Sequence, residues 1–226
     1  MKYAVVFFLV TVVCGLEAYL LMDSWGWLLL WPGLSFLGVS LAYAGLGPKI
    51  FGKRADGSIP RWVVLAYFPY LLPTWIIWRV QCLFAREPAC QQIAPGLWLG
   101  RRLLPAEVPA GATLIVDLTA EFSEPATIRS NRDYLTLPTL DGHVPSAEKL
   151  RHLVEQISVC GDGNVVVHCA SGHGRSAMVV ACVLIAKGLA RDALEAEQII
   201  KTIRPRIGLS PAQRKRVEEF ARSRSL

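Results

Sequence analysis

Apolar residues are concentrated in the first third of this chain, where they form long, nearly uninterrupted segments. Residues 4–22 contain one acidic residue, Glu17, and a stretch of this length is sufficient to cross a bilayer as a helix. Residues 25–47 form a second apolar segment, with an interfacial belt of tryptophans at its start: Trp25, Trp27 and Trp31. The pattern therefore predicts a helical membrane hairpin that turns at Asp23-Ser24.

Two alternatives to an uncleaved first helix are less consistent with the sequence. A cleaved signal peptide would have only Lys2 as its cationic start, and no clear cleavage site of small residues follows the apolar run. Attachment of a lipid at Cys14 is disfavoured because Val13, rather than a small residue, precedes it. An uncleaved membrane helix is the preferred interpretation.

A third apolar segment, residues 62–84, leaves the membrane topology open. The loop before it is basic, with Lys49, Lys53, Arg54 and Arg61, so the positive-inside rule places this loop and the N-terminus in the cytoplasm. A full span over 62–84 would put the rest of the chain outside. Because the segment contains Pro69, Pro73 and Arg79, we favour a re-entrant or interfacial helix, which keeps the rest inside.

The remainder of the chain has the alternating pattern of an α/β domain. Short apolar runs predict strands, and amphipathic stretches predict helices between and after them. A central, largely parallel sheet flanked by helices is the expected fold. Residues 1–88 then form the membrane part and residues 89–226 the second domain. The expected strands are 97–100, 113–118, 133–137 and 165–168, and the expected helices are 145–160, 175–188, 191–203 and 210–223.

Net charge and cysteine content limit the classes of partner and of cysteine site that this chain can have. The chain has a formal net charge of +6 and an isoelectric point near 9.1, but no interleaved basic and aromatic surface typical of nucleic-acid binding. Lipid headgroups and phosphate esters are therefore the expected partners, together with the membrane. The six cysteines form no CxxC pair, so neither a disulfide framework nor a zinc site is expected.

The most informative motif is the run from His168 to Ser176, which follows the apolar residues Val165–Val167. A cysteine, Cys169, ends the strand, and Arg175 opens the next helix five residues after the loop begins. A tight loop between a strand and a helix N-terminus binds phosphate through inward N–H groups and the helix dipole. A thiolate at the base of such a loop is a nucleophile directed at phosphorus.

This motif resembles the signature His-Cys-x-x-Gly-x-x-Arg-Ser of the protein tyrosine phosphatase superfamily, especially its compact dual-specificity branch. The resemblance extends over residues 92–222. It includes the opening strand at Ile93–Gly100, Val116–Thr119, an acid loop at Leu137–Gly142, and Arg204-Pro205-Arg206 before Ser210-Pro211. It implies a cysteine-dependent phosphatase in which a membrane segment precedes the catalytic domain. Because a catalytic thiol must stay reduced, a cytoplasmic orientation is expected.

Each residue of the motif has an expected role. Cys169 forms a phosphocysteine intermediate, and Arg175 binds two phosphate oxygens through its guanidinium. Ser176 donates a hydrogen bond to the sulfur and helps it to leave. His168 stands behind the loop, with its ring bonded to backbone. The remaining loop residues supply N–H groups to the phosphate: Ala170, Ser171, Gly172, His173 and Gly174.

The reaction also requires an acid that protonates the leaving group and later activates water. Asp141, in the loop between a strand and a helix, is the candidate, and His143 lies near the pocket mouth. Asp117 is the second choice, but its position at a strand end favours bonding to backbone. Arg204 and Arg206 are either a second anion contact or a solvated basic edge.

Three functions remain to be weighed. The first is a phosphatase acting on phosphotyrosine, phosphoserine or phosphothreonine in proteins. The second is a phosphatase for lipid phosphates such as phosphatidylglycerophosphate or phosphoinositides, placed at the headgroup plane by the membrane hairpin. The third is an inactive phosphate-binding anchor, which is disfavoured because the expected catalytic residues are all present. The mechanism requires neither a metal nor a cofactor.

Overall fold

The computed structural model describes residues 2–159 and 163–224, which form two compact units. The first unit comprises the N-terminal residues through Arg54, Ser58–Phe84 and the short loop Ala120–Ser123. The second unit comprises Ala55–Gly57, Ala85–Thr119 and the chain from Glu124 onward. The border between the units therefore does not follow the sequence at a single point, because two short loops belong to the unit that is remote from them in sequence.

The first unit contains three helical segments that are long and apolar enough to cross a membrane. The first is α1 (Lys2–Leu20). The second runs over Gly26–Phe51 and contains η1 (Gly26–Leu29), α2 (Leu30–Leu41), η2 (Ala42–Leu46) and η3 (Gly47–Phe51). The third is α3 (Arg61–Phe84). The expected apolar segments are thus all helical, and the second extends four residues beyond residue 47, to Phe51.

The helix α3 continues through both of its prolines, Pro69 and Pro73. Proline has no N–H, so Pro69 leaves the carbonyl of Leu65 without its partner in the helix. The indole Nε1 of Trp31 donates a hydrogen bond of 3.1 Å to this carbonyl. A side chain from the second segment thus replaces the backbone donor that Pro69 lacks.

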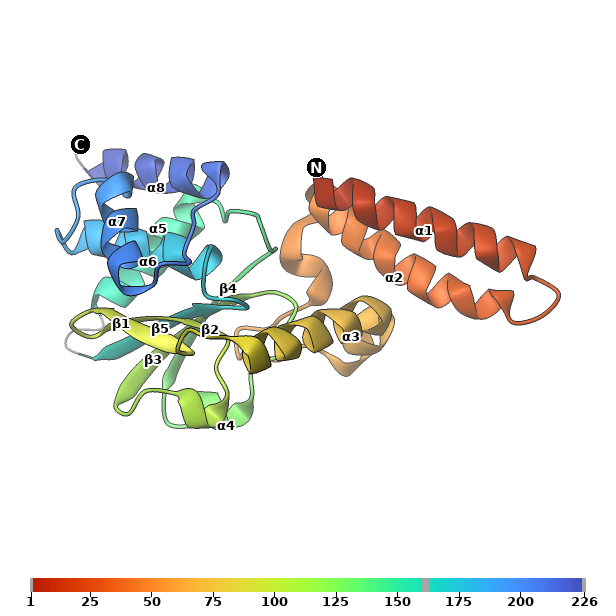
Figure 1. Cartoon of the computed structure of the whole chain (residues 1–226), viewed down its shortest axis with the longest axis horizontal. Helices are drawn as coiled ribbons and strands as arrows, with labels where there is room; N and C mark the ends of the chain where they lie inside the picture. Colours follow the sequence, from red (N-terminus) through yellow and green to blue (C-terminus); the bar gives the residue numbers. More distant parts are fainter. Residues whose placement is uncertain (1, 160–162, 225–226) are drawn as a thin grey trace. The chain divides into compact units, whose positions relative to one another are not determined.

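The second unit is built on a five-stranded sheet with the order β1-β2-β5-β3-β4 (Figure 1). The strands β2 (Leu97–Arg101), β5 (Asn164–Cys169), β3 (Ala112–Thr119) and β4 (Asp133–Thr139) are parallel, and β1 (Cys90–Ala94) pairs antiparallel with β2. The pattern of apolar residues does not predict β1. This strand lies at the edge of the sheet and carries Gln91 and Gln92, so it lacks the apolar run of a buried strand.

Helices cover the sheet in two layers of unequal size (Figure 1). The larger core packs one face of the sheet against α5 (Ala147–Val159), α6 (Arg175–Ala186), α7 (Ala193–Ile203) and α8 (Pro211–Arg224). A smaller core on the other face includes Ile128 of α4 (Ala126–Arg129). The expected helices agree with the structure to within a few residues, except that Cys160, the expected end of α5, lies outside the described residues.

The central strand β5 delivers Cys169 to the carboxyl edge of the sheet, between β2 and β3. The loop that follows passes so close to β2 that its third residue must be glycine. Gly172 has a φ of +77°, and a Cβ added there would lie 2.5 Å from the backbone nitrogen of Arg101 and 2.6 Å from the carbonyl carbon of Gly100. The loop conformation therefore depends on Gly172 for both its torsion angle and its space.

Replacing Gly172 with alanine should destabilise this loop, because the added methyl group meets backbone atoms that cannot rotate away. We expect Gly172→Ala to cost about 1–3 kcal/mol and to lower the thermal midpoint of the detergent-solubilised full chain by several degrees. Gly208→Ala is the matched control, since nothing lies within 4 Å of its added Cβ. Equal midpoints for the two variants, measured by circular dichroism, would contradict this prediction.

Candidate active site

The sulfur of Cys169 lies inside the loop that links β5 to α6. Cys169 is 1% exposed. Its Sγ accepts a hydrogen bond of 3.3 Å from the backbone N–H of Gly172 and lies 3.2 Å from the Oγ of Ser176. Since α6 begins at Arg175, the positive end of the helix dipole also faces this region. The sulfur therefore lies among donors that favour an anion.

The loop carbonyls are bonded to groups outside the loop. The backbone N–H of Arg102 donates to Ala170 O at 3.1 Å, Arg204 Nε donates to Gly172 O at 3.2 Å, and the N–H of Gly208 donates to His173 O at 3.2 Å. In a trans peptide, the N–H points opposite to the C=O of the same plane. The N–H groups of the following residues, which are Ser171, His173 and Gly174, consequently point away from these partners, toward the centre of the loop.

The guanidinium of Arg175 is buried beside the loop that carries Asp141. Its Nη1 donates to Thr139 O at 2.7 Å, and its Nη2 lies 3.3 Å from Asp141 Oδ1. The side chain of Arg175 is 2% exposed, whereas that of Asp141 is 68% exposed. The fold thus brings together an arginine and an aspartate that the sequence selected separately, and it leaves the carboxylate open to solvent. His143 follows on the same loop, with Nδ1 3.5 Å from Asp141 O.

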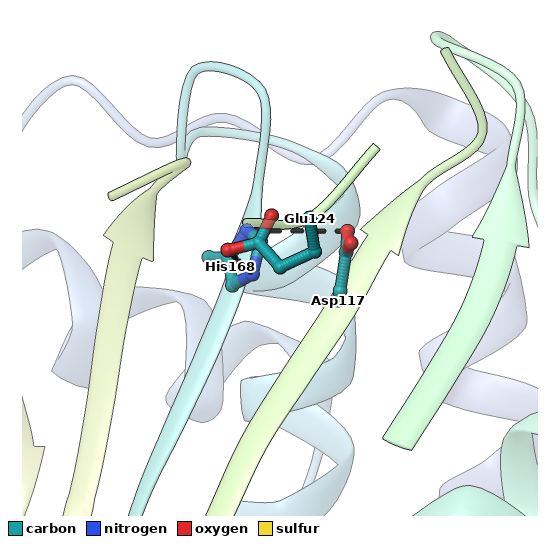
Figure 2. Close-up of side chains that lie close together, drawn as sticks. All are labelled: Asp117, Glu124 and His168. Carbon is teal, nitrogen blue, oxygen red and sulfur yellow. Dashed lines mark ion pairs between the residues drawn. The ribbon is translucent and has the colours of Figure 1, made fainter. Parts of the chain in front are cut away.

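Behind the loop, His168 lies between two buried carboxylates (Figure 2). Its Nδ1 is 4.0 Å from Asp117 Oδ1, and its Nε2 is 3.9 Å from Glu124 Oε1. Sequence reasoning missed Glu124, which comes from the segment after β3 and has no motif around it. Histidine and carboxylates are metal ligands by type, but the guanidinium Nε of Arg102 lies 3.5 Å from Glu124 Oε2 and already supplies a cation there. We therefore interpret the group as a buried charge network.

Asp117 is committed to holding the strand end, as the sequence analysis expected. Its Oδ1 accepts hydrogen bonds of 2.7 Å from both the backbone N–H and the hydroxyl of Thr119, and its Oδ2 accepts one of 2.7 Å from the hydroxyl of Tyr134. Burial raises the pKa of Tyr134, and the adjacent charge of Asp117 raises it further. The phenol therefore stays protonated and remains a donor to the carboxylate.

Arg204 is not part of a solvated basic edge, which corrects one of the two interpretations from the sequence for this residue. It is 1% exposed, and its guanidinium joins three parts of the chain. Besides the bond to Gly172 O, Nη1 donates to Pro88 O at 3.0 Å and to Gln91 Oε1 at 3.1 Å. Burial lowers the pKa of Arg204, while the charges of Glu87 and Cys169 oppose this shift.

Glu87, which the sequence analysis treated only as part of a domain boundary, contacts the phosphate loop. Its Oε2 lies 2.8 Å from Nε2 of His173 and 3.6 Å from Nη2 of Arg204. Burial raises the pKa of Glu87, but the hydrogen bond with His173 and the charge of Arg204 outweigh it, so that the pKa is lowered overall. No sequence motif indicates this contact, because it joins residues that are far apart in the chain.

Comparison with known proteins identifies two relatives that are phosphatases by name. The chain is 32% identical over 134 residues to human dual specificity protein phosphatase 15, which covers 57% of this chain and 44% of the relative. It is 30% identical over 173 residues to phosphatidylglycerophosphate phosphatase PTPMT2 of Arabidopsis thaliana, which covers 71% of this chain and 74% of that protein. The chain thus spans less than half the length of the human relative.

The fold has close counterparts among solved structures. The crystal structure of PTPMT1 in complex with PI(5)P matches 61% of this chain and 99% of its own with a TM-score of 0.52 and 23% identity. The human tyrosine phosphatase-like serine/threonine/tyrosine-interacting protein matches with a TM-score of 0.55 and 22% identity, over 62% of this chain and all of its own. Residues 103–223 match the family model described as Swiss Army Knife protein, DSP-PTPase phosphatase domain. The chain therefore belongs to this family of dual-specificity phosphatase domains within the protein tyrosine phosphatase superfamily.

Proposed function

We propose that this chain is a membrane-anchored phosphatase that hydrolyses phosphate monoesters through a phosphocysteine intermediate on Cys169. The proposal is carried by one observation above all. The sulfur of Cys169 lies between the Oγ of Ser176 and the N–H of Gly172, in a loop whose carbonyls are bonded outward. This arrangement suits a tetrahedral dianion bound by inward N–H groups.

In the first step, the sulfur of Cys169 attacks phosphorus. The S–P bond forms as the P–O bond of the ester breaks, and Asp141 gives its proton to the leaving oxygen. Arg175 binds two phosphate oxygens with its planar guanidinium and holds them as charge shifts in the transition state. The contact of 3.3 Å between Arg175 and Asp141 supports this pairing, because it places the acid next to the phosphate-binding group.

In the second step, water attacks the phosphocysteine. The Asp141 carboxylate accepts a proton from the water, the S–P bond breaks, and inorganic phosphate leaves. Ser176 donates a hydrogen bond to the departing sulfur, which stabilises its negative charge. The two steps balance without a metal or a cofactor. The N–H groups of Ala170, Ser171, Gly172, His173 and Gly174, together with Arg175, form the proposed phosphate site.

Phosphotyrosine, phosphoserine and phosphothreonine in proteins are the proposed substrates. The relative whose name states that it is a protein phosphatase, dual specificity protein phosphatase 15, is 32% identical to this chain over 134 residues. An open site favours this substrate class, because a phosphorylated side chain must reach the sulfur while the rest of its protein stays outside. The side chain of Asp141 is 68% exposed and is therefore accessible to a substrate that approaches from solvent.

A lipid phosphate is the second candidate, and a specific observation favours it. Only residues 85–89 separate the end of the apolar helix α3 from β1, so the chain can span at most about 18 Å between them. A catalytic unit on so short a connection stays near the headgroup plane of any membrane that α3 contacts. The Arabidopsis relative is, by its name, a phosphatidylglycerophosphate phosphatase.

We further propose that α3 lies in the membrane interface and that the catalytic unit faces the cytoplasm. The chain on both sides of α3 belongs to the second unit. Before α3, the carbonyl of Gly57 accepts a hydrogen bond of 2.9 Å from Glu124 N–H, and Asp56 lies 3.7 Å from Arg129. After α3, the second unit resumes at Ala85. Because both flanks of α3 belong to one compact unit, we propose that they lie on the same side of the bilayer.

The exposure pattern of α3 supports an interfacial helix. Val63, Leu71 and Trp78 are buried, and an exposed apolar stripe recurs at helical spacing on the rest of the helix. A helix that is packed along one stripe and apolar along another suits insertion into the headgroup boundary. The exposed stripe comprises Trp62, Leu65, Leu72, Ile76, Val80 and Leu83.

The catalytic assignment predicts two different responses to mutation. Cys169→Ser should abolish turnover of aryl phosphates, because a neutral hydroxyl at this position is a far weaker nucleophile. Asp141→Asn should slow hydrolysis of alkyl phosphates about 100-fold, and of p-nitrophenyl phosphate only a few-fold, since a good leaving group needs no proton. Steady-state kinetics on both ester types decide the matter. Equal slowing for both esters would argue against the acid role, and turnover by the serine variant would remove the nucleophile.

The substrate class is decided by a direct comparison of turnover. If the chain is a protein phosphatase, phosphotyrosine and phosphothreonine peptides should give kcat/KM values at least about tenfold above those for phosphatidylglycerophosphate and phosphatidylinositol 5-phosphate in mixed micelles. Phosphate release is measured at matched detergent, with Cys169→Ser as the blank. The reverse order would transfer the assignment to lipid phosphates.

The topology is tested by labelling single introduced cysteines with a membrane-impermeant maleimide. Ala55→Cys and Lys187→Cys lie at exposed positions of the second unit, and both should react only after the cytoplasmic side is opened. Asp23→Cys, in the turn after α1, should react from the other side. The unmodified chain gives the background from its native cysteines. Labelling of positions 55 and 187 from opposite sides would show that α3 crosses the membrane.

A further inference from the structure

Two guanidinium groups and an imidazole converge on the carboxylate of Glu87. Nε2 of His173 lies 2.8 Å from Oε2, Nη2 of Arg204 lies 3.6 Å from the same oxygen, and Nε of Arg206 lies 3.9 Å from Oε1. These groups come from two elements, the phosphate loop and the segment after α7. The carboxylate comes from the connection between α3 and β1. Side chains of these types around one point are typical of an anion-binding site. Here the carboxylate of Glu87 occupies that point.

This cluster borders the proposed phosphate site. His173 belongs to the loop, and Arg204 donates to the carbonyl of Gly172, whose own N–H bonds the sulfur of Cys169. Arg206 extends the cluster toward solvent, because its side chain is 58% exposed. Arg204 is 1% exposed and donates to backbone carbonyls, so the neighbouring groups of a substrate whose phosphate lies in the loop would meet His173 and Arg206. We call His173 and Arg206 the basic rim.

We propose that Glu87 neutralises the basic rim and thereby selects substrates with one phosphate over substrates with a second phosphate close to the first. The inference rests on the proposed function and adds a specificity-determining residue to it. A second phosphate needs cations beside the loop, and Glu87 occupies the position where it would meet them. The carboxylate both fills that position and repels the added negative charge.

The surroundings of Glu87 fix it in this role. The next residue is Pro88, whose ring restricts the backbone and whose carbonyl accepts the 3.0 Å hydrogen bond from Arg204. The side chain of Glu87 is only 16% exposed, and the lowered pKa keeps it ionised at neutral pH. A second phosphate would have to displace a carboxylate that is anchored at its backbone and bonded at its side chain.

The test compares two soluble lipids with each variant. Short-chain phosphatidylinositol 5-phosphate carries one monoester, and short-chain phosphatidylinositol 4,5-bisphosphate carries two adjacent ones. We expect Glu87→Gln to raise the ratio of kcat/KM for the bisphosphate to that for the monophosphate about fivefold, mainly through a lower KM, as expected for one exposed ion pair. The ratio cancels any uniform change in activity.

Three further variants make the result specific. Glu218→Gln removes an exposed charge of α8 and should leave the ratio unchanged. Adding Arg206→Gln to Glu87→Gln should reverse the gain, because it removes the exposed cation of the rim. Arg206→Glu should lower the ratio, and it serves as the test if Glu87→Gln does not fold. A ratio within twofold of the parent value for both Glu87→Gln and Arg206→Glu would overturn the inference.

These outcomes are separable from failure of the proposed function. If the full chain hydrolyses p-nitrophenyl phosphate in a Cys169-dependent manner but the ratio does not move, the catalytic proposal stands and the specificity inference falls. If the aryl phosphate is not hydrolysed at all, the catalytic proposal itself fails. If Glu218→Gln shifted the ratio as much as Glu87→Gln does, the effect would come from net charge. That result would also reject a role for the basic rim.

Discussion

The candidate site depends on the direction of the carbonyl groups in one short loop. This short loop connects the strand β5 to the helix α6. Without partners outside the loop, its carbonyl oxygens would be free to point toward the position of the anion. Here the backbone of Arg102, the guanidinium of Arg204 and the backbone of Gly208 each bond a loop carbonyl. The N–H groups of the loop then point toward its centre, where they can bind a phosphate. A carbonyl oxygen at the centre would repel the phosphate. The anion site is thus maintained by hydrogen bonds made on its outer surface.

Buried ionisable groups support the site, and each of them has a polar or charged partner. Arg175 and Arg204 are almost inaccessible to solvent, as are Asp117 and Glu124. Moving such groups out of water costs several kcal/mol each unless partners compensate. Hydrogen bonds from Thr119 and Tyr134 to Asp117, and Arg102 beside Glu124, provide that compensation on the face of the sheet opposite Cys169. Removing one partner would leave another charge buried without its counterpart, so the network holds the end of β5 in place.

Each of the two units includes a short loop from the part of the sequence that otherwise forms the other. The loop Ala55–Gly57 belongs to the second unit, and Ala120–Ser123 belongs to the first. Within the first unit, Trp75 Nε1 donates a 2.9 Å hydrogen bond to Glu121 O, and the ring of Trp78 packs against Phe122. The connection after α3 continues directly into Glu87 and Pro88, which contact the phosphate loop and Arg204. Only Ala85 and Arg86 therefore lie between the end of the apolar helix α3 and Glu87, which contacts the loop after β5.

The sequence by itself determined the elements whose causes are local. The apolar segments, the strands of the parallel sheet and the amphipathic helix α5 follow from periodicity, and the loop from Cys169 to Arg175 follows from a strand, two glycines and a helix start within a few residues. Tertiary structure decided the rest. The edge strand β1 has no apolar run of its own, and α3 continues through Pro69 because Trp31, far away in sequence, supplies a donor to Leu65. Glu124 and Glu87 acquire their places only when folding brings distant segments together, and Arg204 becomes buried for the same reason. Local patterns record what a segment prefers, whereas the pairing of a charge with its partner depends on the path of the whole chain.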